Sequence, residues 1–94
     1  MANSYVYIVE CKDGTLYTGY AADVDARVAK HNAGLGAKYT RNRLPVKLRY
    51  KETCSTKSEA LKREYAIKQL SRQQKMALIG RETDALIHHW NTNR

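Results

Sequence analysis

Residues 1–21 constrain the fold most, because they hold two strand-forming runs on either side of a turn signal. Residues 4–11 are rich in Tyr, Val and Ile, and residues 16–21 form the second run. The pair Asp13-Gly14 lies between them, and an Asp-Gly pair between such runs is a strong short-range signal for a β-hairpin. The chain is therefore expected to open with two antiparallel strands.

A helix and a third strand are predicted after the hairpin. Asp23 can cap a helix over residues 24–33, and a glycine stands immediately beyond its expected end. Residues 34–44 are polar, basic and glycine-containing, which is typical of a connecting loop. Residues 46–51 alternate apolar and basic side chains, which is the period of a strand. We expect this third strand to pair in antiparallel fashion.

Two capping-box patterns predict helices in the last part of the chain. One lies at residues 56–59, before a helix to about residue 70, and the other at 71–74, before a shorter helix that ends near residue 80. The predicted order is β-β-α-β-α-α, an α/β (α+β) fold with a three-stranded antiparallel sheet flanked by helices. Residues 1–81 are expected to form this domain, and residues 82–94 a C-terminal tail or short helix.

Positive charge is concentrated in the middle of the chain. Residues 1–25 carry a net charge of −3 and residues 82–94 a net charge of −1, so the total of +8 leaves +12 on residues 26–81. Repulsion within such a concentration of positive charge destabilises a small domain unless a polyanion neutralises it. Nucleic acid is favoured over a membrane surface, because the basic residues are spread over several predicted elements. A basic surface that serves only solubility is the alternative.

Length and cysteine use narrow the class of protein further. Ninety-four residues suffice for one small domain. The two cysteines, Cys11 and Cys54, lack the spacing of a zinc site or a disulfide framework. No uncharged stretch is long enough for a membrane span, and the N-terminus lacks a signal-peptide pattern. We therefore expect a soluble cytoplasmic domain with two reduced, mostly buried thiols.

Three polar residues fall within or beside apolar stripes of the predicted helices. Glu64 lies inside the stripe of the helix after residue 56. A carboxylate there needs a cation, a hydrogen-bond network, a bound proton or a salt bridge to a basic residue at the edge of the stripe. Arg27 and His31, four residues apart, line one edge of the helix over 24–33. They are either a surface pair or part of a site.

These residues also belong to a longer pattern. Tyr5-Val6-Tyr7 and Tyr17-Thr18-Gly19, with Arg27, His31 and Glu64 after them, resemble the GIY-YIG nuclease domain over about residues 4–80. The spacing Tyr-x9-Tyr-x-Gly-x7-Arg-x3-His is much more specific than any one of its parts. The chain is most similar to the small stand-alone bacterial branch of that superfamily. It departs from the pattern at two positions. Tyr5 stands where the motif has its first glycine, and Tyr20 stands where some of these nucleases have a lysine.

The resemblance implies a metal-dependent endonuclease that hydrolyses phosphodiester bonds of DNA, with DNA repair or recombination as the expected context. It implies that Glu64 holds one Mg²⁺ or Mn²⁺ ion and that Arg27 clamps the non-bridging phosphate oxygens. It also implies that Tyr17, supported by Tyr7, is the general base or a relay toward the attacking water. His31 would contact a tyrosine or the phosphate and is a rival base.

The turn of the hairpin decides whether one site can use both tyrosines. With a two-residue turn, Tyr7 and Tyr17 would point to opposite faces of the sheet. With a three-residue loop over 12–14 and Gly14 in a left-handed bulge, Val9 pairs with Tyr17 and both tyrosines share a face. We predict the three-residue loop or an equivalent register shift.

Other basic residues and one tyrosine are the candidates for nucleic-acid binding, with phosphate contacts that carry little sequence information. Tyr39 would stack on an unpaired base or serve as a core or strand-edge residue. The candidates are Lys38, Tyr39, Arg41, Arg43, Lys47, Arg49, Lys68, Arg72 and Lys75. The alternative function is a non-catalytic nucleic-acid-binding module on the same scaffold. A third is an adaptor that uses the apolar residues 86–90, and a partner protein that supplies substrate specificity is a further expectation.

Overall fold

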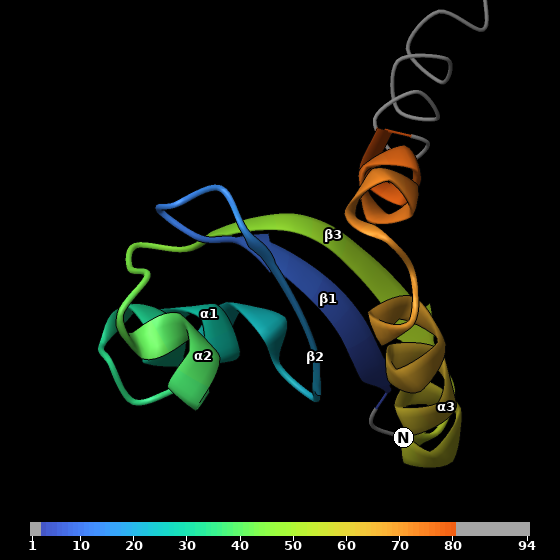
Figure 1. Ribbon diagram of the computed structural model, residues 1–94. Coiled ribbons are helices and arrows are strands. Elements are labelled where there is room, and N and C mark those ends of the chain that lie inside the picture. Colours follow the sequence, from blue (N-terminus) through green and yellow to red (C-terminus); the bar gives the residue numbers. More distant parts are fainter. Residues whose placement is uncertain (1–2, 81–94) are drawn as a thin grey trace, which may run out of the picture.

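The computed structural model describes residues 3–80, which form a three-stranded antiparallel sheet with helices on both faces (Figure 1). The strands are β1 (Ser4–Glu10), β2 (Leu16–Ala21) and β3 (Lys47–Cys54), in the order β2-β1-β3. This confirms the predicted fold class. Because β1 is the central strand, β2 and β3 form the two opposite edges of the sheet.

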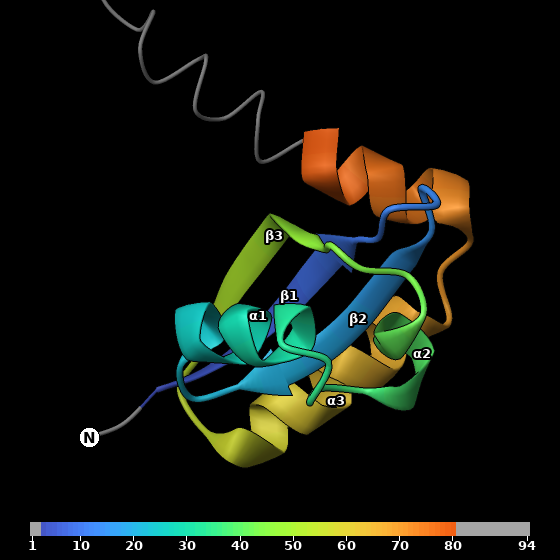
Figure 2. The ribbon, with the colours of Figure 1, turned by 90° about the vertical axis from the view of Figure 1, so that its left-hand side faces the viewer.

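The helices divide between the two faces of the sheet. Helices α1 (Val24–Asn32) and α2 (Lys38–Arg41) cover one face, and α3 (Lys57–Lys68) covers the other, as two views at right angles show (Figures 1 and 2). Residues 72–80 form a further helical segment that follows α3. The expected tail or short helix over 82–94 lies outside the described residues.

Helix α2 corrects the expectation of a loop over 34–44. The order of the labelled elements is β-β-α-α-β-α, with α2 inserted before β3. The sequence of this single turn has no pattern that predicts a helix. A buried side chain holds the turn in place. Thr40, which is completely buried, donates its hydroxyl to the Ala37 carbonyl at 2.9 Å, and its backbone N–H donates to the same oxygen at 3.1 Å.

The hairpin has the predicted three-residue loop. Gly14 has φ +84°, the left-handed conformation that glycine adopts without strain. The Cys11 N–H donates to the Thr15 carbonyl at 2.8 Å. Val9 then pairs with Tyr17, so Tyr7 and Tyr17 lie on the same face of the sheet.

Side-chain caps start the helices where the sequence places them. The Asp23 carboxylate accepts from the Ala26 N–H at 3.0 Å, and the Thr56 hydroxyl accepts from the Glu59 N–H at 3.0 Å. Ser71 and Gln74 form a reciprocal capping box before the helical segment 72–80. These caps satisfy N–H groups that have no partner within the helix.

Two hydrophobic clusters lie on either side of the sheet. On the α3 side, Val6 and Ile8 pack with Ala60, Ile67 and Ile79. On the α1 side, the cluster consists of Tyr7, Val9, Cys11, Ala21, Val24 and Val46. The cysteines are free and buried in different clusters, as expected of reduced thiols. Within residues 3–80, no helix is both long enough and apolar enough to cross a membrane.

Candidate active site

A chain of buried polar groups begins at the centre of the sheet. The Tyr7 hydroxyl lies 2.8 Å from His31 Nε2, and His31 Nδ1 lies 2.9 Å from the Thr40 hydroxyl. All three side chains are almost completely inaccessible to solvent. Strand β1, helix α1 and helix α2 each contribute one of them. Elements that are distant in sequence therefore meet in one hydrogen-bonded chain.

The hydrogen bonds favour one tautomer of His31. Because Thr40 donates its only hydroxyl hydrogen to the Ala37 carbonyl, its oxygen accepts from His31 Nδ1–H. Nε2 is then free of hydrogen and accepts from the Tyr7 hydroxyl. The contact in which the Ala37 N–H would donate to Nδ1 requires the other tautomer and is longer, at 3.4 Å between the two nitrogen atoms. Burial, and then the charge of Arg27, lower the pKa of His31, which also favours the neutral ring.

Two glycines leave the space that this chain of groups occupies. A Cβ atom on Gly19 would lie 2.6 Å from the Tyr7 hydroxyl oxygen, so only glycine lets the Tyr7 ring cross over β2. A Cβ atom on Gly36 would lie 2.2 Å from His31 Nδ1. Gly36 and Thr40 were not singled out from the sequence as site residues. Both residues lie in the glycine-containing segment after α1, which the sequence does mark. The contact of that segment with His31 cannot be predicted without the fold.

Tyr17 completes the aromatic part of the site. Its ring makes an edge contact with the His31 ring at a centroid distance of 5.5 Å and stacks on Tyr39 at 5.9 Å, with 23° between the planes. Unlike Tyr7, which is 1% exposed, Tyr17 is only half-buried. Tyr17 is therefore the tyrosine of the pair that a substrate can reach directly.

Several charged groups act on the pKa of Tyr7. It is raised to about 12, first by burial and next by Tyr17, with a smaller contribution from the Glu64 carboxylate, whereas Arg27 acts in the opposite direction. Contacts therefore bring Tyr7, Tyr17 and His31 together, and the charges of Arg27 and Glu64 act on this network.

Arg27 lies on the solvent side of the network. Its side chain is exposed on α1, and a surface pocket of about 290 Å³ is lined by Arg27, Lys30 and Asp23 with residues at the end of β2. Because this guanidinium is already exposed, it can offer two N–H groups to a phosphate without leaving a buried site.

Glu64 lies on α3, which covers the opposite face. Its side chain is 15% exposed, and Oε2 lies 3.3 Å from Lys68 Nζ. The salt bridge to a basic residue at the edge of the stripe, one of the predicted alternatives, is thus present. Residues 3–80 contain no cluster of three or more His, Cys, Asp or Glu side chains that could enclose a metal. A single carboxylate fits Mg²⁺ or Mn²⁺, which keep several waters and accept phosphate oxygens, rather than zinc.

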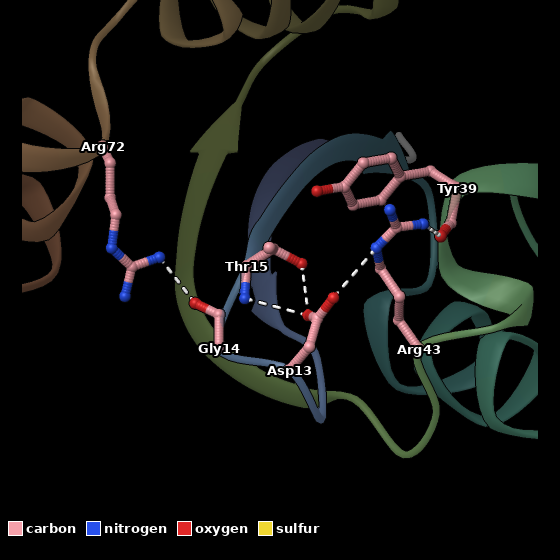
Figure 3. A network of polar contacts seen from close by, with 6 residues as sticks. All are labelled: Asp13, Gly14, Thr15, Tyr39, Arg43 and Arg72. Carbon is pink, nitrogen blue, oxygen red and sulfur yellow. Dashed lines mark hydrogen bonds and ion pairs between the residues drawn. The ribbon is translucent and has the colours of Figure 1, made fainter.

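The candidate nucleic-acid residues separate into free and engaged side chains. Lys38 and Arg41 are exposed on α2, on the same face of the sheet as Arg27. Burial, and then the nearby charge of Lys68, lower the pKa of Lys75. Arg43 and Arg72, in contrast, are bound to the hairpin tip: Arg43 contacts Asp13 at 3.1 Å, and Arg72 donates to the Gly14 carbonyl at 2.5 Å (Figure 3).

Two further basic candidates lie away from the site. Lys47 and Arg49 belong to β3, at the opposite edge of the sheet from Tyr17 on β2. Arg49 forms an ion pair with Glu10. The structure therefore does not bring these two residues together with the network around Tyr7.

Comparison with a family model gives a direct match to this region. Residues 3–77 match the family described as "GIY-YIG: GIY-YIG catalytic domain". The matched segment contains every residue of the network described above.

Proteins of high sequence similarity are small and match over almost their full length. A UPF0213 protein of Staphylococcus epidermidis is 66% identical over 79 residues, which cover 84% of this chain and 96% of the relative. A UPF0213 protein of Halobacterium salinarum is 66% identical over 75 residues, which cover 80% and 97%.

Solved structures agree with the architecture. The solution NMR structure of the UPF0213 protein BH0048 from Bacillus halodurans has a TM-score of 0.54 and 52% identity, and the match covers 83% of each chain. That of protein EF2693 from E. faecalis has a TM-score of 0.59 and 40% identity, and the match covers 92% of this chain and 90% of that one.

Proposed function

Because the chain belongs to the GIY-YIG catalytic-domain family, whose members are typically endonucleases, we propose that it is a metal-dependent endonuclease that hydrolyses DNA phosphodiesters. One observation carries the proposal: the buried Tyr7–His31 hydrogen bond lies beside the half-buried ring of Tyr17, and the charges of Arg27 and Glu64 act on Tyr7. The names of the UPF0213 relatives state no activity, so the substrate and a context in DNA repair or recombination belong to the proposal.

Arg27 is proposed to bind the scissile phosphate. It is exposed, adjoins a pocket, and lies close enough to Tyr7 and His31 to influence the pKa of both. Its planar fork matches two non-bridging oxygens, and its charge opposes the negative charge that develops in the transition state. Lysine offers a point charge without that fork, so Arg27→Lys should not restore full activity.

Glu64 is proposed to hold the metal ion. A bound Mg²⁺ or Mn²⁺ would polarise the phosphate and lower the pKa of a bound water. The carboxylate is partly buried at a position where it affects Tyr7, and its partner Lys68 is an exposed i,i+4 neighbour, a kind of pair that contributes little energy. Exchange of that partner for a cation would therefore cost little.

Tyr17 is proposed as the general base or relay, because it is the more accessible tyrosine of the pair. Tyr7, with a pKa of about 12, keeps its proton near neutral pH and holds Nε2 of His31 by donating to it. The lowered pKa of His31 keeps its ring neutral, so His31 is a second group that can accept a proton through Tyr7.

The DNA backbone is proposed to follow basic residues of α2, α3 and the helical segment 72–80. Lys38 and Arg41 continue from Arg27 along the α2 surface, and Lys68 and Lys75 are like charges close together on the α3 side. Phosphates would relieve the repulsion between those two lysines. Binding is then expected to weaken steeply with salt and to depend little on sequence.

A cleavage assay tests the proposed function. Single-stranded, duplex and branched DNA are incubated with Mg²⁺ or Mn²⁺ and with wild type, Glu64→Ala or Arg27→Ala. We expect cleavage by wild type, loss in EDTA, and a fall of at least about 100-fold in both variants. No cleavage of any substrate, with salt-dependent binding retained, would instead support the non-catalytic module. Activity that survives both substitutions would place the chemistry elsewhere.

A further inference from the structure

We propose that Asp13, Arg43 and Tyr39 are positioning residues, and that together they form a brace that holds the ring of Tyr17. The contacts from Asp13 through Arg43 to Tyr39 are drawn in Figure 3. The proposal rests on the proposed function for its effect on catalysis, because Tyr17 is the group that the brace would hold. Its structural part can be measured without any substrate.

The brace begins with the aromatic contact. The Tyr39 ring stacks on the Tyr17 ring at 5.9 Å, and the Arg43 guanidinium carbon lies 4.1 Å from the centroid of the Tyr39 ring. Arg43 Nη1 also donates to the Tyr39 carbonyl at 2.8 Å. Arg43 thus holds both the ring and the backbone of the residue that contacts Tyr17.

The other end of Arg43 is fixed to the hairpin. Its Nε donates to Asp13 Oδ2 at 3.1 Å. Asp13 Oδ1 accepts from the backbone N–H of Thr15 at 3.1 Å and from its hydroxyl at 2.6 Å, so the carboxylate cannot rotate freely. Asp13 precedes Tyr17 by four residues on the same hairpin, so the contacts form a closed loop from β2 to α2 and back.

This geometry separates Arg43 and Tyr39 from the phosphate-binding role predicted from the sequence. Nε and Nη1 of Arg43 are already used within the chain, and the Tyr39 ring, although 40% exposed, already has Tyr17 and Arg43 against it. Lys38 and Arg41, on the same short helix, have exposed side chains. Substitutions at neighbouring positions of α2 should therefore have different effects.

A half-buried tyrosine that loses a stacking partner can leave the orientation needed for reaction. Misplacement of a reacting group by about 1 Å can cost roughly 100-fold in rate. We therefore expect Arg43→Lys, which keeps the charge but loses the planar fork, to lower kcat by about ten-fold or more with little change in the Kd for DNA. Lys38→Gln should weaken DNA binding instead.

The experiment compares five proteins: wild type, Arg43→Lys, Tyr39→Leu, Tyr39→Phe and Lys38→Gln. Ring signals of Tyr17 are followed by NMR on protein with ¹³C-labelled tyrosine, without DNA or metal, and are assigned with Tyr17→Phe. We expect Arg43→Lys and Tyr39→Leu to shift the Tyr17 signals and weaken its NOEs to His31. Tyr39→Phe, which keeps the stacked ring, should restore them, and Lys38→Gln should leave them unchanged. Thermal unfolding verifies that each variant is folded.

Kinetics then decide the functional part. A fall in kcat at constant Kd for Arg43→Lys and Tyr39→Leu, with recovery in Tyr39→Phe, supports the brace. Unshifted Tyr17 signals, or an effect of Arg43→Lys on Kd alone, would overturn it. If wild type cleaves no DNA, the proposed function fails, and the NMR result still tests the brace independently.

Discussion

The two faces of the sheet differ in what they bury. The face toward α3 is packed with Val6, Ile8 and Ile67, and the face toward α1 buries the hydrogen-bonded groups of Tyr7, His31 and Thr40. Buried polar groups contribute to a stable fold only when each finds its partners, whereas apolar packing stabilises without such demands. We therefore expect the α3 face to contribute chiefly packing, and the α1 face to combine apolar packing with most of the groups proposed for the chemistry.

The central strand belongs to both faces at once. Alternate residues of β1 point to opposite sides, so Val6 and Ile8 support the apolar face while Tyr7 reaches the site. Glu64 is the one catalytic candidate contributed from the α3 side. This gives clear ways to break the comparison, either by removing chemistry without stability or stability without chemistry.

Glu64→Gln should have the largest effect, and on chemistry alone. We expect metal-dependent cleavage to fall by at least about 100-fold, because the amide is a poor ligand for Mg²⁺. The free energy of unfolding should change by less than about 1 kcal/mol, since only one i,i+4 ion pair, with the exposed Lys68, is lost. Rate measurements and urea unfolding on the same preparation test this, and a large loss of stability would assign Glu64 a structural role instead.

Ile67→Ala should show the opposite behaviour. Ile67 is completely buried against the strands on the α3 face, and removal of such a side chain typically costs about 2–5 kcal/mol of unfolding free energy. Cleavage per folded molecule should change little. Urea unfolding gives the first quantity and kcat below the transition the second. A kcat loss comparable to that of Glu64→Gln would mean that packing and chemistry are not separable.

Mild acid should lower the free energy of unfolding through His31. The pKa of His31 is lowered in the folded protein from an ordinary value of 6.5, so the unfolded chain binds the proton more readily. Stability is then full above pH 6.5 and falls as the pH drops below it toward the folded pKa. Urea unfolding between pH 7 and 5 should show this slope in wild type, and His31→Gln should flatten it. An unchanged slope in His31→Gln would exclude His31 as its source.

Thr18→Val should have the smallest effect, and a favourable or neutral one. Thr18 is 2% exposed on the α3 face, and within residues 3–80 its hydroxyl oxygen has no hydrogen-bond partner. Replacement of an unsatisfied buried hydroxyl by a methyl group should leave the stability unchanged or raise it by about 1 kcal/mol. A loss above about 1 kcal/mol on urea unfolding would show that the hydroxyl is satisfied after all.

Local patterns were sufficient to predict most of the fold. Asp23, Thr56 and Ser71 cap helices where the sequence places them, and the shared face of Tyr7 and Tyr17 was predicted from the loop at Gly14. Each of these features depends on neighbours in the sequence. Helix α2 was missed because its stability depends on Thr40 and His31, nine residues apart, rather than on a helical pattern.

The surroundings of the site were harder to predict than its members. Arg43 was assigned to phosphate binding because it is basic, but its partner Asp13 lies thirty residues earlier. Similarly, Gly36 was not linked to His31, because the close approach of a loop to an imidazole leaves no mark in composition or period. Long-range pairing of this kind follows from the topology, which short patterns do not determine.

A titration with Mn²⁺ tests most directly whether residues from different elements share one metal-dependent site. Paramagnetic broadening is followed in the NMR spectrum of the free protein. We expect amide signals around Tyr17 on β2 and Glu64 on α3 to broaden together, and Glu64→Gln to abolish the effect. Broadening centred on another acidic region such as Glu52 and Glu59, or equal broadening in Glu64→Gln, would contradict the account.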